Sequence, residues 1–209
     1  MATLRVISGS AKGKRLKTVP GDSTRPITDQ VKEALFNILA DEVRDIDILD
    51  LFGGTGAVGI EALSRGAKSV FFLDTSHQAI KVIKENLEIT RFSSMATVLR
   101  GDAFGYLQNP SRLGYDLIYV APPQYKDMWA KAMRLIDAKP ELLNDEGQII
   151  VQINPIEWFE QSYDNFIEFD RRKYGDTELI FFEKPFEDFE ENRPENQSGV
   201  RPVENDILN

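Results

Sequence analysis

The sequence predicts an α/β fold built on a mostly parallel sheet, and two observations lead to that prediction. From Asp45 onward, short apolar runs alternate with segments whose apolar residues recur at helical spacing, which is the pattern of repeated βαβ units. The first apolar run ends in a glycine-rich turn, as expected where a parallel strand passes into a helix. Crossover helices cover such a sheet, so we expect helices on both of its faces.

Residues 1–26 are expected to form a basic N-terminal hairpin and turn. Residues 4–19 alternate loosely and contain Gly9 and Gly13, which is typical of a hairpin or two short strands. Residues 20–26 (PGDSTRP) are rich in turn-forming residues. A helix follows, and the residues expected on its buried face are Ile27, Val31, Ala34, Leu35, Ile38 and Leu39.

The rest of the sheet follows from the same patterns. The expected strands are 46–52, 69–73, 96–99, 116–120, 148–153, 166–170 and 178–182. The expected helices are 57–65, a helix capped by Ser76 with Ile80, Ile83 and Leu87 inward, 103–107 and 128–136. The connections between the last three strands are short, so one of these strands is expected to be antiparallel, at the edge of the sheet. Residues 185–209 are poor in aliphatic residues and expected to be disordered.

The composition excludes several kinds of chemistry. The chain has 209 residues and no cysteine, so disulfides, cysteine-ligated zinc and thiol catalysis are excluded. One histidine, His77, gives no basis for a histidine metal site, and we expect it at the surface near a helix start. No apolar run approaches the length of a membrane span and the start does not read as a signal peptide, so we expect a cytoplasmic protein without metal or membrane contact.

The charge is distributed unevenly along the chain. The net charge is −9, but residues 1–32 hold seven basic and two acidic residues, whereas residues 185–209 hold seven acidic and two basic ones. The overall charge argues against a bulk nucleic-acid binder. The basic start has two interpretations, an arm that touches RNA phosphates or a hairpin that is merely well solvated.

The end of the first strand carries the most informative motif. Asp50 is followed by Phe52-Gly53-Gly54-Thr55-Gly56, and Gly54, Gly56 and Gly59 spell G-x-G-x-x-G. Such glycines let the backbone approach a nucleotide ligand, but they do not choose between NAD and S-adenosylmethionine. A carboxylate at Asp50 suits a ligand with an ammonium group, which S-adenosylmethionine has and NAD lacks. The alternatives are that Asp50 caps the next helix and that the glycines form only a tight turn.

Polar residues follow the next three strands as well. Asp74 ends the second strand, where a carboxylate accepts hydrogen bonds from both ribose hydroxyls of either cofactor. Asp102 follows the third strand and either accepts from an adenine amino group or caps the short helix behind it. The fourth strand ends in Ala121-Pro122-Pro123-Gln124-Tyr125. Two prolines there remove backbone donors and leave carbonyl groups facing the cleft, which suits a target with an amino group.

These motifs together resemble the small-subunit (16S) rRNA guanine-N2 methyltransferase D family, over roughly residues 4–184. The most specific part is LRVISGSAKGKRLKTV followed by TRPITDQVKEALFNIL, and ILDLFGGTGAVGIEALSRGA resembles the family's glycine loop and following helix. The resemblance implies a Rossmann-like class I methyltransferase fold in residues 27–184, with a seven-stranded sheet whose last strand is antiparallel. It also implies S-adenosyl-L-methionine as cofactor, small-subunit rRNA or the assembling subunit as partner, and a monomer.

The resemblance assigns roles to individual residues. The implied cofactor-binding residues are Asp50, Phe52, Gly53, Gly54, Thr55, Gly56, Asp74, Thr75, Asp102, Ala103 and Ala121. The implied catalytic residues are Pro122, Pro123, Gln124 and Tyr125. The implied RNA-binding residues are Lys12, Lys14, Arg15 and Arg25.

The fourth-strand motif departs from the family pattern, which has Asp or Asn before the two prolines and an aromatic residue after them. Here Ala121 cannot accept a hydrogen bond from the target amino group. Loss of one such preorganised contact typically costs about 10²–10³ in rate. Either the Pro122 carbonyl and alignment suffice, or Gln124 and Tyr125 replace the missing groups, or the chain binds without methylating. We expect an active enzyme that uses Gln124 and Tyr125.

Three competing functions stay open at this point. A catalytically silent RNA-binding or ribosome-assembly protein is favoured by Ala121 and opposed by the intact Asp50, Asp74 and glycine loop. An NAD-dependent oxidoreductase is supported only by the G-x-G-x-x-G spacing. A small-molecule methyltransferase is weakly opposed by the basic arm.

Overall fold

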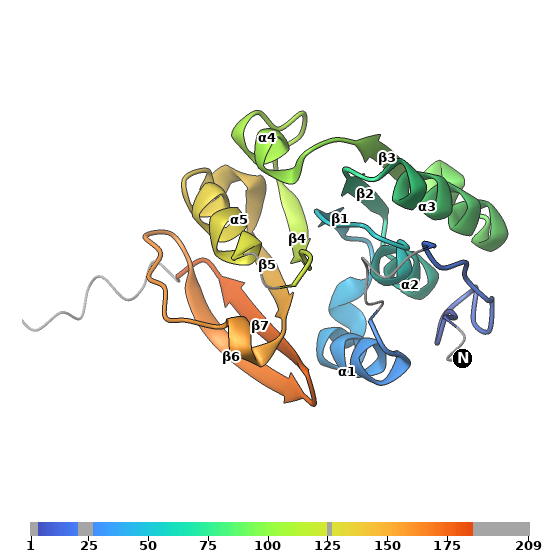
Figure 1. Ribbon diagram of the computed structural model, residues 1–209, viewed down its shortest axis with the longest axis horizontal. Coiled ribbons are helices and arrows are strands. Elements are labelled where there is room, and N and C mark those ends of the chain that lie inside the picture. Colours follow the sequence, from blue (N-terminus) through green and yellow to red (C-terminus); the bar gives the residue numbers. More distant parts are fainter. Residues whose placement is uncertain (1–3, 21–26, 125–126, 186–209) are drawn as a thin grey trace, which may run out of the picture.

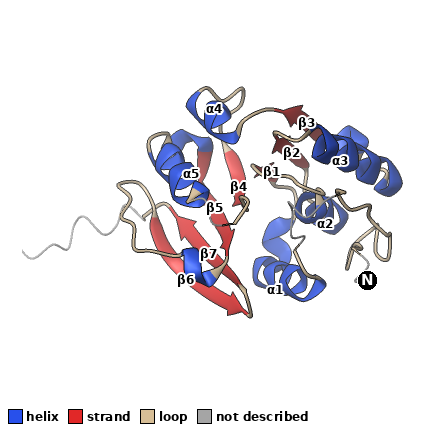
Figure 2. Cartoon of the chain, viewed as in Figure 1, coloured by secondary structure: helices blue, strands red, loops and turns tan. Residues whose placement is uncertain are grey.

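A computed structural model describes residues 4–20, 27–124 and 127–185. In these residues the helices and strands alternate as predicted (Figures 1 and 2). The α-helices are α1 (Asp29–Leu39), α2 (Ala57–Arg65), α3 (His77–Thr90), α4 (Ala103–Gln108) and α5 (Met128–Asp137). The strands are β1 (Asp47–Asp50), β2 (Ser69–Asp74), β3 (Ala96–Arg100), β4 (Tyr115–Val120), β5 (Leu143–Ile153), β6 (Ile167–Tyr174) and β7 (Thr177–Glu183). Four short 3₁₀ helices that the sequence analysis missed are Ala40–Val43, Ser93–Met95, Pro140–Leu142 and Pro155–Glu157.

The seven strands form one sheet in the order β3-β2-β1-β4-β5-β7-β6. Strands β1 to β5 pair in parallel, and β7 pairs antiparallel with both β5 and β6. The predicted antiparallel last strand is therefore confirmed, but its predicted place at the edge is wrong. β7 pairs with β5 on one side. On its other side it pairs with β6, to which the tight Tyr174–Thr177 turn connects it, so β6 is the edge strand.

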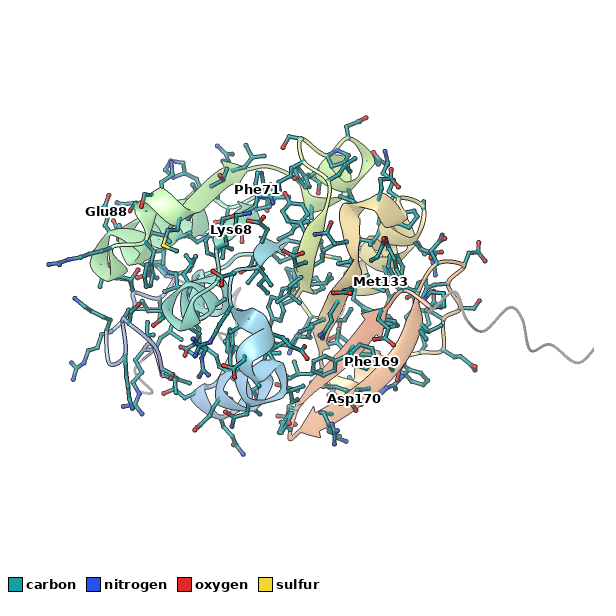
Figure 3. The ribbon with its side chains drawn as sticks, turned by 180° about the vertical axis from the view of Figure 1, so that it is seen from behind. Lys68, Phe71, Glu88, Met133, Phe169 and Asp170 are labelled. Atoms are coloured by element: carbon teal, nitrogen blue, oxygen red, sulfur yellow. The ribbon has the colours of Figure 1, made fainter. Side chains whose placement is uncertain are left out.

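Two apolar cores cover the two faces of the sheet. The first contains α1, α2, α3 and residues of the N-terminal segment, and the second contains α4 and α5. Figure 1 shows these helices on opposite sides of the central strands. Figure 3 labels Met133 of α5, which belongs to the second core, and Phe71 of β2, which is partly buried and packs against that core. The predicted helical face of α1 needs one correction. Ile38 is exposed, and Lys32 and Phe36 are buried in its place.

Residues 4–20, here called the arm, pack along α2 and α3. The predicted hairpin is present, since the Leu16 N–H donates to the Leu4 carbonyl (2.8 Å) and the Gly13 N–H donates to the Val6 carbonyl (2.9 Å). The two halves of the hairpin are not β-strands, because their β-pairing consists of one isolated bridge between Arg5 and Arg15. Several amides of the arm bond to helix side chains and not to the opposite half of the hairpin.

Glu61 of α2 and Lys32 of α1 provide the first of these anchors, and both side chains are fully buried. The Glu61 carboxylate accepts hydrogen bonds from the Ile7 N–H (2.7 Å) and the Ser8 N–H (2.9 Å). Lys32 Nζ lies 3.6 Å from Glu61 and donates to the Arg5 carbonyl (2.5 Å). This buried pair therefore fixes the start of the arm to two helices at once.

Ser64, one turn further along α2, provides the second anchor. Its hydroxyl accepts from the Ala11 N–H (2.9 Å), and its carbonyl accepts from the Ser10 N–H (2.8 Å). Gly9 has φ +79°, and a Cβ there would lie 1.7 Å from the Ser64 carbonyl oxygen. Only glycine allows this close approach, so the arm is held against α2 by contacts specific to its sequence.

Candidate cofactor and substrate site at the sheet switch point

The strand order reverses between β1 and β4, and the sequence-predicted motifs follow these two strands. Ligands of open α/β sheets bind outside the carboxyl ends of the strands at such a reversal. The glycine loop follows β1, and Ala121-Pro122-Pro123 follows β4, whose residue Tyr119 pairs with Asp50. The fold thus brings the predicted cofactor loop beside the predicted substrate motif.

The glycine loop turns sharply and lies close to α3. Gly54 and Gly56 have φ of +54° and +76°, in the left-handed region that favours glycine. The Gly56 N–H donates to the Gly53 carbonyl (2.7 Å), which closes the turn. A Cβ on Gly53 would lie 2.9 Å from Cδ1 of Ile83 on α3, so a larger residue there would push the loop and helix apart.

Asp50 is buried at the end of β1, before this loop, and one of its carboxylate oxygens lacks a hydrogen-bond partner within the described part of the chain. It is 2% exposed, and its Oδ1 has no hydrogen-bond partner among the described residues. Burial and the nearby Asp74 raise the pKa of Asp50 to about 7, although the backbone N–H groups of Phe52 and Gly59 oppose that rise in pKa. Gly59 lies in the first turn of α2, which supports the interpretation that Asp50 caps this helix. The Oδ1 atom, which has no partner in the residues described, can still accept a hydrogen bond from a ligand.

This pKa gives a pH prediction with a definite sign. The folded protein keeps a proton on Asp50 that the unfolded chain releases above its ordinary pKa of 3.8. The stability due to this proton is complete below that value and is lost as the pH rises through about 7. We expect the melting temperature of the ligand-free protein to fall more steeply between about pH 5 and 8 in the wild type than in Asp50→Asn, which does not ionise. Equal slopes in the two proteins would contradict this pKa.

Asp74 closes the loop from the neighbouring strand. Its Oδ2 accepts from the Gly54 N–H (2.9 Å) and its Oδ1 accepts from the Ser76 N–H (2.8 Å). A carboxylate oxygen can accept more than one hydrogen bond, so both oxygens keep capacity for further donors. Asp74 therefore joins the glycine loop to the start of α3 and offers two acceptors at the end of β2.

The remaining predicted cofactor residues follow the carboxyl ends of β1, β2 and β3, which are neighbours in the sheet. Asp102 caps α4 by accepting from the Gly105 N–H (2.8 Å), so the capping interpretation is confirmed for it. Phe52 is half-buried and meets the Phe104 ring edge-on at 6.3 Å between centroids. Thr75 is exposed, whereas Thr55 and Ala103 are buried.

The end of β4 is partly open. Ala121 is half-buried and packs against the core on the α1–α3 side, Pro122 and Gln124 are half-buried, and Pro123 is exposed. Tyr125 lies outside the described residues. The half-buried amide of Gln124 is therefore the described side chain of this motif that could accept a hydrogen bond.

The predicted RNA-binding residues are distributed along the arm. Lys12, Lys14 and Arg15 are exposed, and none of them makes an ion pair within the described part of the chain. Arg25 lies outside the described residues. No described helix is long and apolar enough to cross a membrane, and no cluster of metal-ligating side chains occurs among the residues described.

Sequence reasoning missed three buried polar residues that bond to the arm: Lys32, Glu61 and Asn86, of which Asn86 also bonds to the glycine loop. Each lies on the inner face of a helix among apolar residues. A polar side chain in such a position was the available signal, because burial of a polar group is costly unless it is hydrogen-bonded.

Known proteins share the sequence pattern and the fold of this chain. Residues 4–183 match the family described as Conserved hypothetical protein 95. A Bacillus subtilis protein named "Putative rRNA methyltransferase YlbH" is 36% identical over 87% of this chain and 99% of its own length. Ribosomal RNA small subunit methyltransferase D of Escherichia coli K12 is 30% identical over 71% of this chain and 74% of its own. The solved structure of the E. coli "Putative methyltransferase yhhF" superposes with a TM-score of 0.75 at 27% identity, over 87% and 98% of the two chains.

The fold and the similar proteins define a protein of the Rossmann-like methyltransferase class. Within that class, the chain belongs to the family described as Conserved hypothetical protein 95, the small-subunit rRNA methyltransferase D family.

Proposed function

We propose that this chain is an S-adenosylmethionine-dependent methyltransferase that modifies a guanine N2 amino group of small-subunit rRNA. The observation that supports it most is the arrangement at the switch point, where the buried free oxygen of Asp50 and the acceptors of Asp74 flank a glycine loop. Membership of a family whose relatives are named as rRNA methyltransferases supplies the substrate class. We expect it to act as a cytoplasmic monomer on rRNA or the assembling subunit.

The residues present fit the cofactor. S-adenosylmethionine supplies an activated methyl group when bound. The free Asp50 Oδ1 suits its ammonium group, because a buried carboxylate oxygen without a partner favours a cationic donor. Asp74 suits the ribose hydroxyls, and the glycines leave the backbone open to close approach. Phe52, Thr55, Thr75, Asp102, Ala103 and Ala121 complete the proposed cofactor site.

The target amino group would lie against the end of β4. The lone pair of a guanine N2 is delocalised into the ring, and acceptors on its hydrogens favour its localisation toward the methyl group. The Pro122 carbonyl and the Gln124 amide are the proposed acceptors, Pro123 fixes the backbone, and Tyr125 is the proposed stacking ring for a base turned out of its helix. Lys12, Lys14, Arg15 and Arg25 would contact RNA phosphates.

Two binding measurements test this proposal. S-adenosylhomocysteine at about 100 times its Kd should stabilise the fold by about 2.7 kcal/mol. That gain raises the melting temperature by roughly 5–10 °C for a chain of this size, while NAD should leave it unchanged. Binding to an rRNA fragment should weaken steeply between about 50 and 200 mM salt. A shift with NAD alone, or salt-independent RNA binding, would contradict the proposal.

One observation favours a second candidate. Ala121 cannot supply the acceptor that the family places before the two prolines, so a catalytically silent protein that binds cofactor and RNA during subunit assembly has a specific basis. This candidate predicts the same cofactor and RNA binding and differs only in methyl transfer.

A further inference from the structure

Asn86 on the inner face of α3 joins the arm to the glycine loop. Its side chain is fully buried. Nδ2 donates to the Thr55 carbonyl (2.9 Å) and to the Lys17 carbonyl (3.1 Å), and Oδ1 accepts from the Lys17 N–H (2.7 Å). Both donors of the amide and one of its acceptor sites are therefore used by backbone groups from two distant segments.

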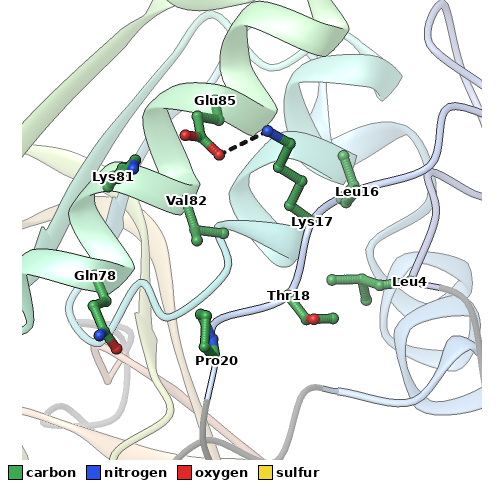
Figure 4. Close-up of a pocket in the computed structure, with 9 residues that line it drawn as sticks. All are labelled: Leu4, Leu16, Lys17, Thr18, Pro20, Gln78, Lys81, Val82 and Glu85. Carbon is green, nitrogen blue, oxygen red and sulfur yellow. Dashed lines mark hydrogen bonds and ion pairs between the residues drawn. The ribbon is translucent and has the colours of Figure 1, made fainter.

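The two segments joined by Asn86 belong to different parts of the proposed site. Thr55 lies in the glycine loop between two left-handed glycines, and Ile83, one turn before Asn86, packs against that loop. Lys17 lies in the arm, two residues after Arg15. Figure 4 shows Lys17 reaching from the arm to Glu85 of α3, with Nζ 2.9 Å from the carboxylate, beside a cavity of about 650 Å³ between arm and helix.

The Lys17–Glu85 pair is too exposed to hold the arm in place by itself. The Lys17 side chain is 56% exposed, and ion pairs at the surface contribute little. The Asn86 side chain is fully buried, its bond to Thr55 is buried and its two bonds to Lys17 are part-buried. The last two pair both backbone groups of Lys17, in the manner of an added strand. Breaking the hydrogen bonds of a buried amide costs free energy. Separation of either the arm or the loop from α3 would therefore be unfavourable.

We propose that Asn86 is a positioning residue that couples RNA binding by the arm to cofactor binding by the glycine loop. The inference rests on the proposed function, since it assigns RNA to the arm and S-adenosylmethionine to the loop. A ligand that orders one segment also orders the Asn86 amide, so the second ligand loses less entropy when it binds. Thermodynamic linkage then requires each ligand to raise the affinity for the other by the same factor.

The affinity for a small-subunit rRNA fragment, with and without saturating S-adenosylhomocysteine, tests this coupling. We expect S-adenosylhomocysteine to tighten RNA binding by about fivefold or more in the wild type, within the usual range of such couplings. In Asn86→Leu, which keeps the approximate volume and removes all three bonds, the factor should fall to about one. A purely structural role would weaken each affinity separately and leave the factor unchanged.

Thr90→Val is the matched control on the same helix. The Thr90 hydroxyl is buried and donates to the Asn86 carbonyl (2.7 Å), and among the described residues it makes no hydrogen bond to the arm or the glycine loop. This variant should keep the wild-type factor. A wild-type factor of one, or an unchanged factor in Asn86→Leu, would overturn the inference. A wild type that binds neither S-adenosylhomocysteine nor RNA would instead overturn the proposed function.

Hydrogen exchange of the wild type keeps the inference testable if Asn86→Leu does not fold. S-adenosylhomocysteine should slow exchange of the Lys17 N–H, whose acceptor is Asn86 Oδ1. The Gly114 N–H, which bonds to the Glu141 carbonyl (3.1 Å) away from arm and loop, is the internal reference and should not change. An unchanged exchange rate at Lys17 with ligand bound would overturn the inference.

Discussion

Replacement of Glu61 by alanine is expected to lower the free energy of unfolding by about 3–5 kcal/mol, the usual cost of removing one partner of a buried ion pair. The carboxylate is fully buried and accepts bonds from two amides of the arm and, at 2.9 Å, from Arg65 Nε. Burial already lowers the pKa of Lys32, and Glu61 opposes that fall in pKa. The variant would leave the Lys32 ammonium and the amides of Ile7 and Ser8 buried without this acceptor.

Urea denaturation, thermal unfolding and limited proteolysis measure this effect. At roughly 2–4 °C per kcal/mol for a chain of this size, the melting temperature should fall by about 6–20 °C. Trypsin should cut more readily at Lys12, Lys14 and Arg15 as the arm loosens. Asp41→Ala, which removes a surface ion pair with Arg44, should stay within about 0.5 kcal/mol of the wild type. A similarly small change in Glu61→Ala would show that this pair does not hold the arm.

Replacement of Asp74 by alanine should have the largest effect on cofactor binding. Two charge-assisted hydrogen bonds to the ribose would be lost, each worth about 1.5–3 kcal/mol, so affinity for S-adenosylhomocysteine should fall by about 10²–10⁴. The glycine loop would also lose the acceptor of its Gly54 N–H.

Calorimetric titration with S-adenosylhomocysteine measures this loss. Asp145→Ala is the matched control, because Asp145 is an exposed carboxylate at the start of β5 that pairs with Lys184. It should keep the wild-type affinity. If Asp74→Ala bound S-adenosylhomocysteine as tightly as Asp145→Ala, the ribose assignment would be wrong.

Local patterns were sufficient to predict the elements that position the site. The helix 57–65 was predicted to the residue, and the Ser76 cap of α3 is confirmed, since its hydroxyl accepts from the Ala79 N–H (3.3 Å). These features depend on residues close together in the chain, so periodicity and capping rules reach them. The order of β1 and β4 places the two motifs together because parallel strands end at the same edge of the sheet.

Contacts between distant segments account for most of what the sequence did not predict. Glu61 bonds to residues about fifty positions earlier, and Asn86 bonds to Lys17 across 69 positions. Short-range periodicity carries no information about such partners. The same limit explains Ile38, which fits the helical pattern but is exposed because Lys32 and Phe36 turn toward the arm and the core. It also explains β7, whose place in the sheet depends on pairing and not on propensity.

The most direct test of the proposed activity is transfer of labelled methyl from S-adenosylmethionine to unmodified small-subunit rRNA or subunits, with the wild type beside Ala121→Asp and Gln124→Ala. We predict that the wild type labels a guanine at N2 and that Gln124→Ala, which loses the proposed amide acceptor, is slower by up to about 10²–10³. Label transferred by Ala121→Asp alone would contradict the proposed activity. It would identify the chain as a silenced relative whose cofactor and RNA sites are intact.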